Sequence, residues 1–539
     1  MATVAGIERT LRTLLRSRNG SATAVLVAAL DATGDELRTG AVRALALRED
    51  STGHRRLVER LQRLPEAVRH ALADVPQSAP LARTLPALIT SGNNPLARRA
   101  AEAAAIWRLP EALAAIVAAS READADVESR LATVARMLAR ELEQRLSFGA
   151  RPDDGCQDPS FARRAAINEL VALLNDYGRR GSRSWLEVLL TLAPGDEPAV
   201  LRVLMDEAHA AHQPLVEALG AGREAGVARL LGHALSDTRS PQALLDIAAA
   251  RNEPEVIAAM LAEVSAPIGL RVRENCGRID DLAWLEADRI GLLTDMPGDA
   301  QAKAIAIAAA SKASRRRLVA AIGQLLRSGA PEAKAAAAKA IERVPSHLAS
   351  EPLAMALDSD EPAAAATAAK LLRKKNLPQA TGQLVGLLDH DDERVRRSAQ
   401  RSLKEVSLAT FRDHYETLDP KQRESAGRLV GKADPLAIES LRAELRSGAA
   451  GRRLKALELI EATGLAASLT AELLAAAEDR DAGVRCEAIR LLGGAEPTEA
   501  VRQAIRVAAV DRSAVVRDAA AAVADRLGEP ALLVAGDDW

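Results

Sequence analysis

The sequence predicts an all-α protein, built from two-helix repeats that stack on one another. Three observations predict it: the composition, a turn-and-helix motif that recurs about every 30 residues, and a length of 539 residues, too long for one compact core. Hydrophobic residues make up 48% of the chain but aromatic residues only 2%. Small aliphatic side chains must therefore fill the core, and the abundant alanine, leucine, arginine and glutamate favour helix over strand.

The repeat is clearest near the C-terminus, where three segments align without gaps. They are LLDHDDERVRRSAQRSL (387–403), AAEDRDAGVRCEAIRLL (476–492) and AAVDRSAVVRDAAAAVA (508–524). Each is typical of a helix end, an acidic turn and a second helix that opens with Val-Arg. Looser copies occur earlier in the chain. Together they predict an α/α superhelix (solenoid) of roughly 16–17 two-helix units.

The regularity and the charge of the repeats change along the chain. We predict N-terminal repeats over 1–147, a divergent acidic middle over 148–300, well-matched repeats over 301–530 and a tail over 531–539. Within the middle region, Phe148–Ser160 is expected to be a loop insertion and Ala266–Asp299 a divergent repeat. The net charges of residues 1–150, 151–300 and 301–539 are +4, −9 and +3, which gives −2 for the whole chain.

The repeat motif, D-x-[DS]-x-x-V-R-x-x-A, resembles a HEAT repeat of the short bacterial kind also found in phycobilin lyases. It is matched by Asp479, Asp481, Val484, Arg485 and Ala488, and by Asp511, Ser513, Val516, Arg517 and Ala520. A third copy, with Asp392, Val395, Arg396 and Ala399, has His390 at the first acidic position. The resemblance implies an α/α superhelix. It also implies that the turn aspartate and the helix-opening arginine pair across adjacent units, so that Asp479, Arg485, Asp511 and Arg517 form a structural ladder.

Motifs for catalysis, cofactors and metals are weak in this sequence. His209 and His212 are three residues apart, as on one helical face, but the H-E-x-x-H motif is absent. Gly427–Ala433 is similar to a phosphate-binding loop, yet it is one residue short and lacks the Ser or Thr. Gly220–Gly226 lacks the spacing of a dinucleotide-binding loop, and we interpret both glycine segments as helix boundaries. We therefore expect no enzyme activity, no cofactor and no metal.

The best candidate for a binding site is a concentration of positive charge. Residues 312–404 hold 17 basic and 10 acidic side chains. The candidate residues for binding an acidic ligand are Arg373, Lys374, Arg396, Arg397 and Arg401. If these side chains repeat on one side of successive units, they form a positive stripe. The alternative is that they are ordinary solvated helix faces.

These features are consistent with three functions. The leading hypothesis is a non-enzymatic scaffold or adaptor that binds one or more protein partners, acidic ones included, along an extended surface. A nucleic-acid-binding protein that resembles the HEAT-like DNA-alkylation-repeat glycosylases is the first alternative. The slight negative charge and the scarcity of aromatic residues weigh against it. A chromophore lyase-like modifying protein is the second alternative, and only the repeat subtype suggests it.

The cysteines and the apolar runs indicate the compartment. Cys156, Cys276 and Cys486 are odd in number and far apart, which favours a reducing environment. The first residues lack the apolar segment of a secretory signal, and no apolar run approaches the roughly 20 residues of a membrane span. We expect a cytoplasmic monomer that does not enter the membrane.

Overall fold

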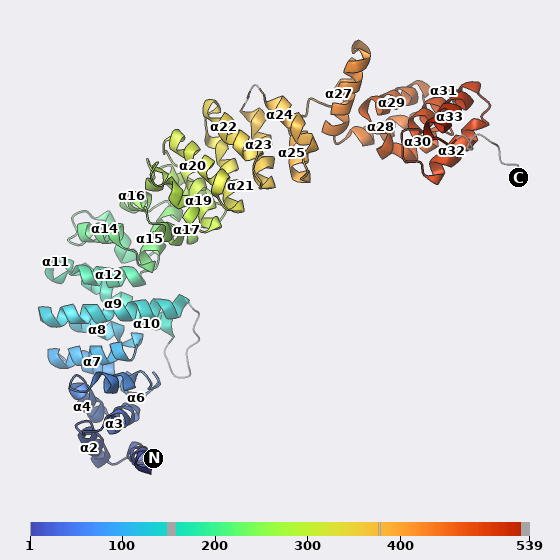
Figure 1. Ribbon diagram of the computed structural model, residues 1–539. Coiled ribbons are helices and arrows are strands. Elements are labelled where there is room, and N and C mark those ends of the chain that lie inside the picture. Colours follow the sequence, from blue (N-terminus) through green and yellow to red (C-terminus); the bar gives the residue numbers. More distant parts are fainter. Residues whose placement is uncertain (1, 148–157, 376, 378, 530–539) are drawn as a thin grey trace. The chain divides into compact units, whose positions relative to one another are not determined.

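Every regular element is a helix in the part of the chain that the computed structural model describes, which is residues 2–147, 158–375, 377 and 379–529 (Figure 1). The all-α fold predicted from the sequence is confirmed. Cys156, most of the expected loop insertion and the tail over 531–539 lie outside the described residues. The chain forms two compact units, Met1–Ala321 and Ile322–Trp539. The four-region division made from the sequence stays a prediction.

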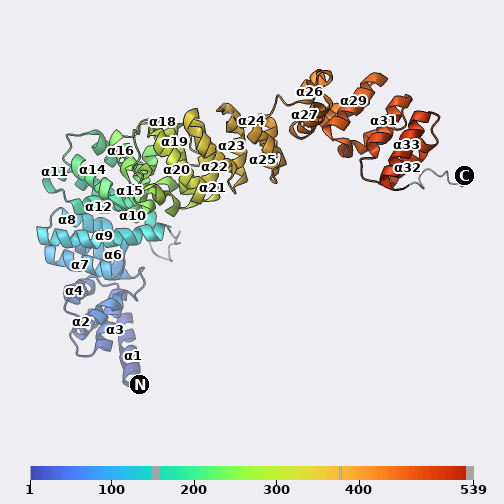
Figure 2. The same ribbon diagram turned by 45° about the horizontal axis from the view of Figure 1, so that its top comes forward.

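The first unit consists of short helices that follow one another closely (Figure 2). They are α1 (Ala2–Arg16), α2 (Gly20–Ala29), α3 (Asp35–Leu47), α4 (Ser51–Leu61), α5 (Glu66–Arg69), α6 (Pro80–Ile89), α7 (Asn94–Ile106), α8 (Leu113–Ser120), α9 (Ala125–Ser147), α10 (Pro159–Asn175), α11 (Tyr177–Arg180), α12 (Arg183–Leu192), α13 (Pro198–Met205), α14 (His212–Ala221), α15 (Ala225–Ser236), α16 (Gln242–Ala250), α17 (Pro254–Ala262), α18 (Leu270–Cys276) and α19 (Gly298–Ala310). Helix α20 (Arg315–Ser328) contains the division between the units.

The second unit continues the alternation of two helices per repeat. Its helices are α21 (Pro331–Ala340), α22 (Ser346–Leu357), α23 (Pro362–Lys374), α24 (Ala380–Gly386), α25 (Glu393–Ser402), α26 (Leu408–His414), α27 (Pro420–Ala433), α28 (Ala437–Leu445), α29 (Ala450–Thr463), α30 (Thr470–Ala476), α31 (Ala482–Leu492), α32 (Glu499–Ala509) and α33 (Ala514–Leu527). Helices α21, α23 and α25 pack in sequence, as do α27, α29, α31 and α33, so every second helix lies in one layer.

The repeat motif has a direct structural meaning in α25, α31 and α33. Its valines, Val395, Val484 and Val516, are fully buried between neighbouring repeats. The aspartate before the helix is an N-cap: the Oδ1 atom of Asp481 accepts hydrogen bonds from the backbone N–H groups of Gly483 (2.9 Å) and Val484 (3.1 Å). Since the first turn of a helix has no internal acceptor for these groups, the acidic turn fixes where the second helix begins.

Neighbouring repeats are also joined by side chains that donate to the ends of helices in the adjacent repeat. The Arg251 guanidinium, 2% exposed, donates to the carbonyls of Leu219 (3.2 Å) and Gly222 (2.6 Å). Lys375 donates to the carbonyl of Glu342 at 2.9 Å. The last carbonyls of a helix lack partners within it, so each such contact satisfies an acceptor and fixes the spacing of two repeats.

The segment Ala266–Asp299 departs from the two-helix pattern. After α18 it forms two 3₁₀ helices, η3 (Ala283–Leu285) and η4 (Ile290–Asp295), in place of a second α-helix. Trp284 is buried here. The side-chain amide of Asn275 donates to three carbonyls of the preceding repeat, including that of Asp237 at 2.8 Å.

Two glycines interpreted as a helix boundary lie inside a helix instead. Gly427 and Gly431 belong to α27, and a Cβ atom at these positions would come within 2.3 Å and 2.4 Å of the carbonyl oxygens of Ala462 and Thr463. The boundary interpretation is therefore wrong for Gly427. These glycines let α27 approach α29 more closely than any residue with a side chain would allow.

Candidate functional site

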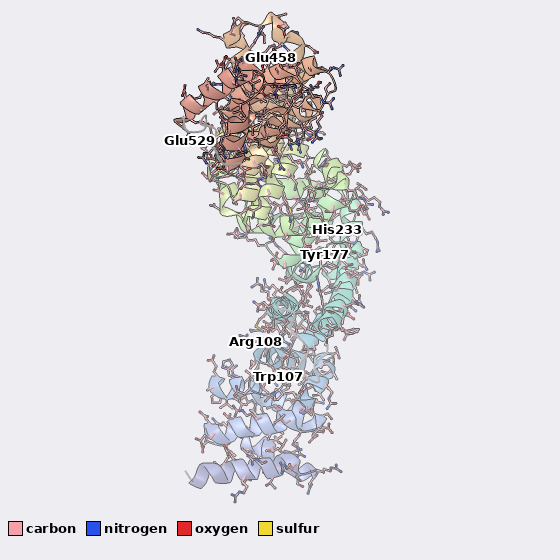
Figure 3. All side chains as sticks on the ribbon, turned by 90° about the vertical axis from the view of Figure 1, so that its right-hand side faces the viewer. Trp107, Arg108, Tyr177, His233, Glu458 and Glu529 are labelled. Carbon is pink, nitrogen blue, oxygen red and sulfur yellow. The ribbon has the colours of Figure 1, made fainter. Side chains whose placement is uncertain are left out.

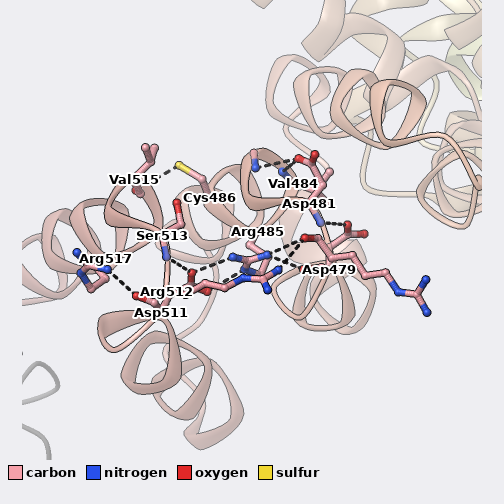
Figure 4. A network of polar contacts seen from close by, with 12 residues as sticks. Asp479, Asp481, Val484, Arg485, Cys486, Asp511, Arg512, Ser513, Val515 and Arg517 are labelled. Carbon is pink, nitrogen blue, oxygen red and sulfur yellow. Dashed lines mark hydrogen bonds and ion pairs between the residues drawn. The ribbon is translucent and has the colours of Figure 1, made fainter.

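The aspartates and arginines of the repeat motif form a chain of contacts in the second unit (Figure 4). The Nε and Nη2 atoms of Arg485 each donate to a carboxylate oxygen of Asp511 at 2.8 Å. Its Nη1 atom donates to the carbonyls of Asp479 (2.8 Å) and Arg480 (3.1 Å). One guanidinium thus pairs with the turn of the next repeat and closes the turn of its own.

The same contacts recur, with changes, one repeat before and one repeat after Arg485. Arg453 pairs with Asp479 at 2.8 Å and donates to the carbonyl of Ser447 at 2.8 Å. Arg517 donates to the carbonyl of Asp511 at 2.7 Å, and no carboxylate partner is found for it among the described residues. Each ion pair therefore runs from one arginine to the turn aspartate of the following repeat. Sequence reasoning missed Arg453, although Arg453, Arg485 and Arg517 are equally spaced by 32 residues.

Arg453, Asp479, Arg485 and Asp511 are enclosed rather than open to a ligand, whereas Arg517 at the end of the ladder is exposed. The side chains of Arg485 and Asp511 are 7% and 14% exposed, and those of Arg453 and Asp479 are 15% and 14% exposed. The hydrogen bond from Arg485 holds the pKa of Asp511 below its ordinary value. Each Arg485 and Arg453 guanidinium has a carboxylate and a carbonyl as partners, so these side chains serve the stacking of the repeats.

The five predicted ligand-binding cations lie on α23 and α25, which pack side by side. Arg373 donates to the carbonyl of Ser402 at 2.9 Å and pairs with Glu405. Lys374 pairs with Glu342, and its hydrogen bond lowers the pKa of that carboxyl. Both cations at the end of α23 therefore have carboxylate partners within the chain.

The three arginines of α25 have different surroundings. Arg396 donates to the carbonyls of His390 (2.6 Å) and Asp391 (2.7 Å), which is the turn-closing contact that Arg485 and Arg517 make. Arg397 pairs with Glu393 at 2.5 Å. Arg401 is exposed, and no hydrogen bond or ion pair is found for it within the described part of the chain.

Arg401 lies at the edge of a groove of about 480 Å³ between α25, α26 and α28. Its apolar lining includes Leu403, Val406, Leu408, Leu436 and Leu441. Leu436 stands out because it is 68% exposed, whereas most leucines of the second unit are buried. Three cations, Arg401, Lys404 and Arg412, also line the groove.

The groove forms where successive helices of one layer in the second unit, α25 and α27, pack against each other least. A continuous apolar core begins at Leu408 and extends to Ala524, and α25 lies before it. The side chain of Asp434 accepts hydrogen bonds from the backbone of Leu408 (2.8 Å) and Leu436 (2.9 Å). This carboxylate joins the starts of α26 and α28 and fixes the backbone of Leu436, which lines the groove.

The groove combines an apolar surface with a net positive charge, because three cations, Arg401, Lys404 and Arg412, line it beside the carboxylates of Asp434 and Glu444. Arg412 pairs with Glu444 at 3.3 Å, and the carboxylate of Asp434 is occupied by backbone groups. Arg401 and Lys404 are both exposed, and neither has a partner among the described residues. Such a site can take an apolar side chain next to a carboxylate.

The described residues offer little for catalysis or metal binding. No group of three or more His, Cys, Asp or Glu side chains is placed among them to hold a metal ion. The His209 ring accepts a hydrogen bond from the backbone of Ala211 at 3.1 Å and so closes a local turn. Burial raises the pKa of Cys276 to about 12, which makes its thiol a poor nucleophile at neutral pH. No helix in the described ranges is long and apolar enough to span a membrane.

Comparison with known proteins gives structural likeness at low identity. No protein-family model matches the sequence, and no curated protein matches it. A crystal structure of Kap121p is 12% identical over 98% of this chain and 64% of that chain, with a TM-score of 0.23. A homology model of the full-length AP-3 complex contains a chain 12% identical over 97% of this chain and 96% of its own length, with a TM-score of 0.34. This chain thus spans about two thirds of the length of Kap121p.

A third structure, from work on a phosphorylation switch in the interaction between cadherin and beta-catenin, has a chain that is 12% identical. The match covers 93% of this chain and 96% of that one, with a TM-score of 0.29. The fold of stacked two-helix repeats described above rests on the helices, caps and ladder of this chain itself. The particular kinship to the repeats of phycobilin lyases stays a prediction.

Proposed function

We propose that this chain is a non-enzymatic scaffold that binds an acidic segment of a protein partner in the groove between α25, α26 and α28. The observation that carries the proposal is that an exposed leucine, Leu436, lines the same groove as two unpaired cations, Arg401 and Lys404. An exposed apolar side chain gains free energy when a partner removes it from water. The two cations then select a partner with carboxylates flanking its apolar residue.

Of the five cations in the positive stripe expected from the sequence, the proposal keeps only Arg401 as a contact for the partner. The other four cations already have partners within the chain, and displacing these partners would offset much of the gain from a new ion pair. Arg401 needs no such exchange. Lys404 adds a second available charge three residues further on, which sequence reasoning did not single out.

A protein partner fits the groove better than a nucleic acid. A nucleic-acid surface needs many cations that follow a phosphate backbone, usually with aromatic residues for stacking. Here two free cations accompany leucines, and the lining contains no aromatic side chain. The cytoplasmic location and the monomeric state expected from the sequence are part of the same proposal.

Affinity capture with matched variants tests this function. The full chain is used as bait in a native lysate of its source, beside Arg401→Glu/Lys404→Glu and Leu436→Asp. The control is Arg394→Glu/Arg397→Glu, which makes the same charge change on α25 at two exposed arginines that are paired with Asp392 and Glu393. Removing two charge-assisted contacts should reduce recovery of the partner by about tenfold or more.

The outcomes separate the hypotheses. A protein recovered by the wild type and the control but lost from both groove variants supports the proposal. Recovery that is equal for all four baits contradicts it, as does material that nuclease treatment removes. Far-ultraviolet circular dichroism of each bait shows that the repeats are folded, since exposed positions tolerate exchange.

A further inference from the structure

Arg108 in the first unit has an unusual backbone conformation. It lies two residues after Ile106, the last residue of α7, and its φ of 51° makes it the single non-glycine residue with a positive φ among the described residues. L side chains rarely adopt this region, because the Cβ atom crowds the neighbouring carbonyl. A strained residue that persists in a fold often serves a function other than stability.

The conformation of Arg108 is fixed by the end of α7. The backbone N–H of Leu109 donates to the carbonyl of Ala104 at 2.9 Å, and that of Arg108 donates to the carbonyl of Ala105 at 3.1 Å. The first of these bonds is typical of a Schellman helix end, in which glycine usually occupies the left-handed position. Arginine stands where glycine would fit without strain.

Contacts around the turn hold the backbone without help from the Arg108 side chain. Trp107 precedes Arg108 in the chain, and both are labelled in Figure 3. The indole N–H of Trp107 donates to the carbonyl of Val75 at 2.7 Å. The carbonyl of Arg108 accepts hydrogen bonds from Gln77 (2.8 Å) and Arg145 (2.6 Å). These contacts use only the backbone of Arg108 and its neighbours, so they do not require an arginine side chain at position 108.

The Arg108 side chain contributes little to folding. It is 74% exposed, and its ion-pair partner is Glu141 at 3.7 Å. Glu141 also has a closer partner, Arg145, at 3.2 Å. Exposed ion pairs of this kind are worth little, so the contact does not explain why arginine is tolerated at a strained position.

The side chain of Arg108 lines a surface pocket of about 460 Å³ against α9. Two further arginines, Arg136 and Arg140, enter the pocket from α9, where they are one helical turn apart, and Glu141 is the only acidic residue of the lining. Arg136 is held by Glu187 at 3.1 Å. Arg140 is exposed and has no partner in the described part of the chain.

We propose that this pocket binds a phosphate group, with Arg108 and Arg140 as the residues that contact it. Glu187 balances Arg136, and Glu141 pairs more closely with Arg145 than with Arg108, so Arg108 and Arg140 leave an excess of positive charge at the pocket. The planar fork of a guanidinium matches two phosphate oxygens. A phosphate monoester suits the excess better than a carboxylate, because it carries about 1.5 to 2 negative charges at pH 7. This site is separate from the groove of the second unit and does not depend on the function proposed there.

The test measures the affinity of the full chain for a fluorescent peptide with one phosphoserine, beside the same peptide with glutamate in its place. Inorganic phosphate serves as a competitor. We expect the phosphopeptide to bind at least about tenfold more tightly than the glutamate peptide, and the affinity to fall as the pH drops below about 6. Displacement by millimolar inorganic phosphate indicates a site for the free anion, and resistance to it a site for a phosphorylated protein.

Three variants separate binding from strain. Arg108→Gly should weaken phosphopeptide binding by about tenfold or more, yet leave the thermal midpoint unchanged or raise it by about 2 °C, because the strain is relieved. Arg140→Gln should weaken binding with no change in the midpoint. Arg130→Gln, which removes an exposed arginine of α9 outside the pocket, is the control that should retain full affinity.

Two results would overturn the inference. One is a phosphopeptide affinity that is equal for the wild type, Arg108→Gly and Arg140→Gln, or no better than that of the glutamate peptide. The other is a fall of several degrees in the midpoint of Arg108→Gly, which would show that the Arg108 side chain is retained for stability.

Discussion

Replacing Arg485 by methionine should loosen the C-terminal repeats, and the structure gives the size of the effect. The substitution keeps most of the apolar stem of the side chain but removes a guanidinium that makes four hydrogen bonds. Two of them go to the carboxylate of Asp511 and two to the carbonyls of Asp479 and Arg480. Truncating one partner of a well-buried ion pair costs about 3–5 kcal/mol. Since Asp511 is 14% exposed and water can reach it, we expect Arg485→Met to lower the free energy of unfolding by about 2–3 kcal/mol.

Arg517→Met is the matched control, because Arg517 occupies the same position of the next repeat. It makes one hydrogen bond to the carbonyl of Asp511, at 2.7 Å, and has no carboxylate partner among the described residues. Loss of this hydrogen bond should lower the free energy of unfolding by only about 0.5–1 kcal/mol. A difference of roughly 1–2 kcal/mol between the two variants therefore measures what the carboxylate pairing adds.

Native-state hydrogen exchange of the amides in α31 and α33 measures both variants in the intact chain. The free energy of local opening of these helices should fall in Arg485→Met, while the amides of α3 and α7 in the first unit should exchange as in the wild type. Equal exchange in Arg485→Met and Arg517→Met would refute the ladder as a source of stability. Loss of protection throughout the chain would refute the idea that each repeat depends mainly on its neighbours.

Two further predictions follow from the second unit. Because the hydrogen bond from Arg485 lowers the pKa of Asp511, the stability from this pair is complete above the ordinary pKa of about 3.8 and is lost as the pH falls through the lower folded-state pKa. Acid unfolding below about pH 4 should accordingly be less steep in Arg485→Met than in the wild type, and identical profiles would contradict the assignment. Gly427→Ala should lower the urea midpoint by the equivalent of about 1–3 kcal/mol, because its Cβ meets the carbonyl of Ala462 at 2.3 Å. Gly382→Ala, in the open surroundings of α24, should be neutral or stabilising, and equal effects of the two substitutions would disprove the close helix contact.

The repeat fold could be predicted because its determinants are local in the sequence. The acidic N-cap, the buried Val395, Val484 and Val516, and the alanines that follow them recur at nearly constant spacing. The residues that dominate the composition are strong helix formers, so they also favour an all-α fold. Pairs of short amphipathic helices with no other way to bury their apolar stripes must then stack.

The contacts of the cations could not be predicted in the same way. The partners of Arg373 and Lys374 lie about one repeat away, and a sequence shows that a charge is present but not which carboxylate it reaches. Arg453 follows another arginine, so the motif did not show which of the two opens the ladder. The tight approach at Gly427 depends on the distance between two helices, which no local pattern records.

The groove was invisible for a related reason. It exists because α25 packs only weakly against α27, and there the exposed Leu436 lines the same groove as Arg401 and Lys404. Within the positive stripe, the sequence included Arg401 but gave no reason to separate it from its neighbours. Arg401 differs from the other four cations because they contact groups of the chain itself, and only the structure shows those contacts.

The most direct test of the scaffold account is a hydrogen-exchange footprint of the full chain with the partner recovered by affinity capture. The account predicts new protection over residues 400–412 and 433–444, which line the groove, and no change on the ladder helices α31 and α33. The footprint should disappear with Arg401→Glu/Lys404→Glu and persist with Arg394→Glu/Arg397→Glu. Protection that falls elsewhere while residues 400–412 and 433–444 exchange as in the free chain would contradict the account.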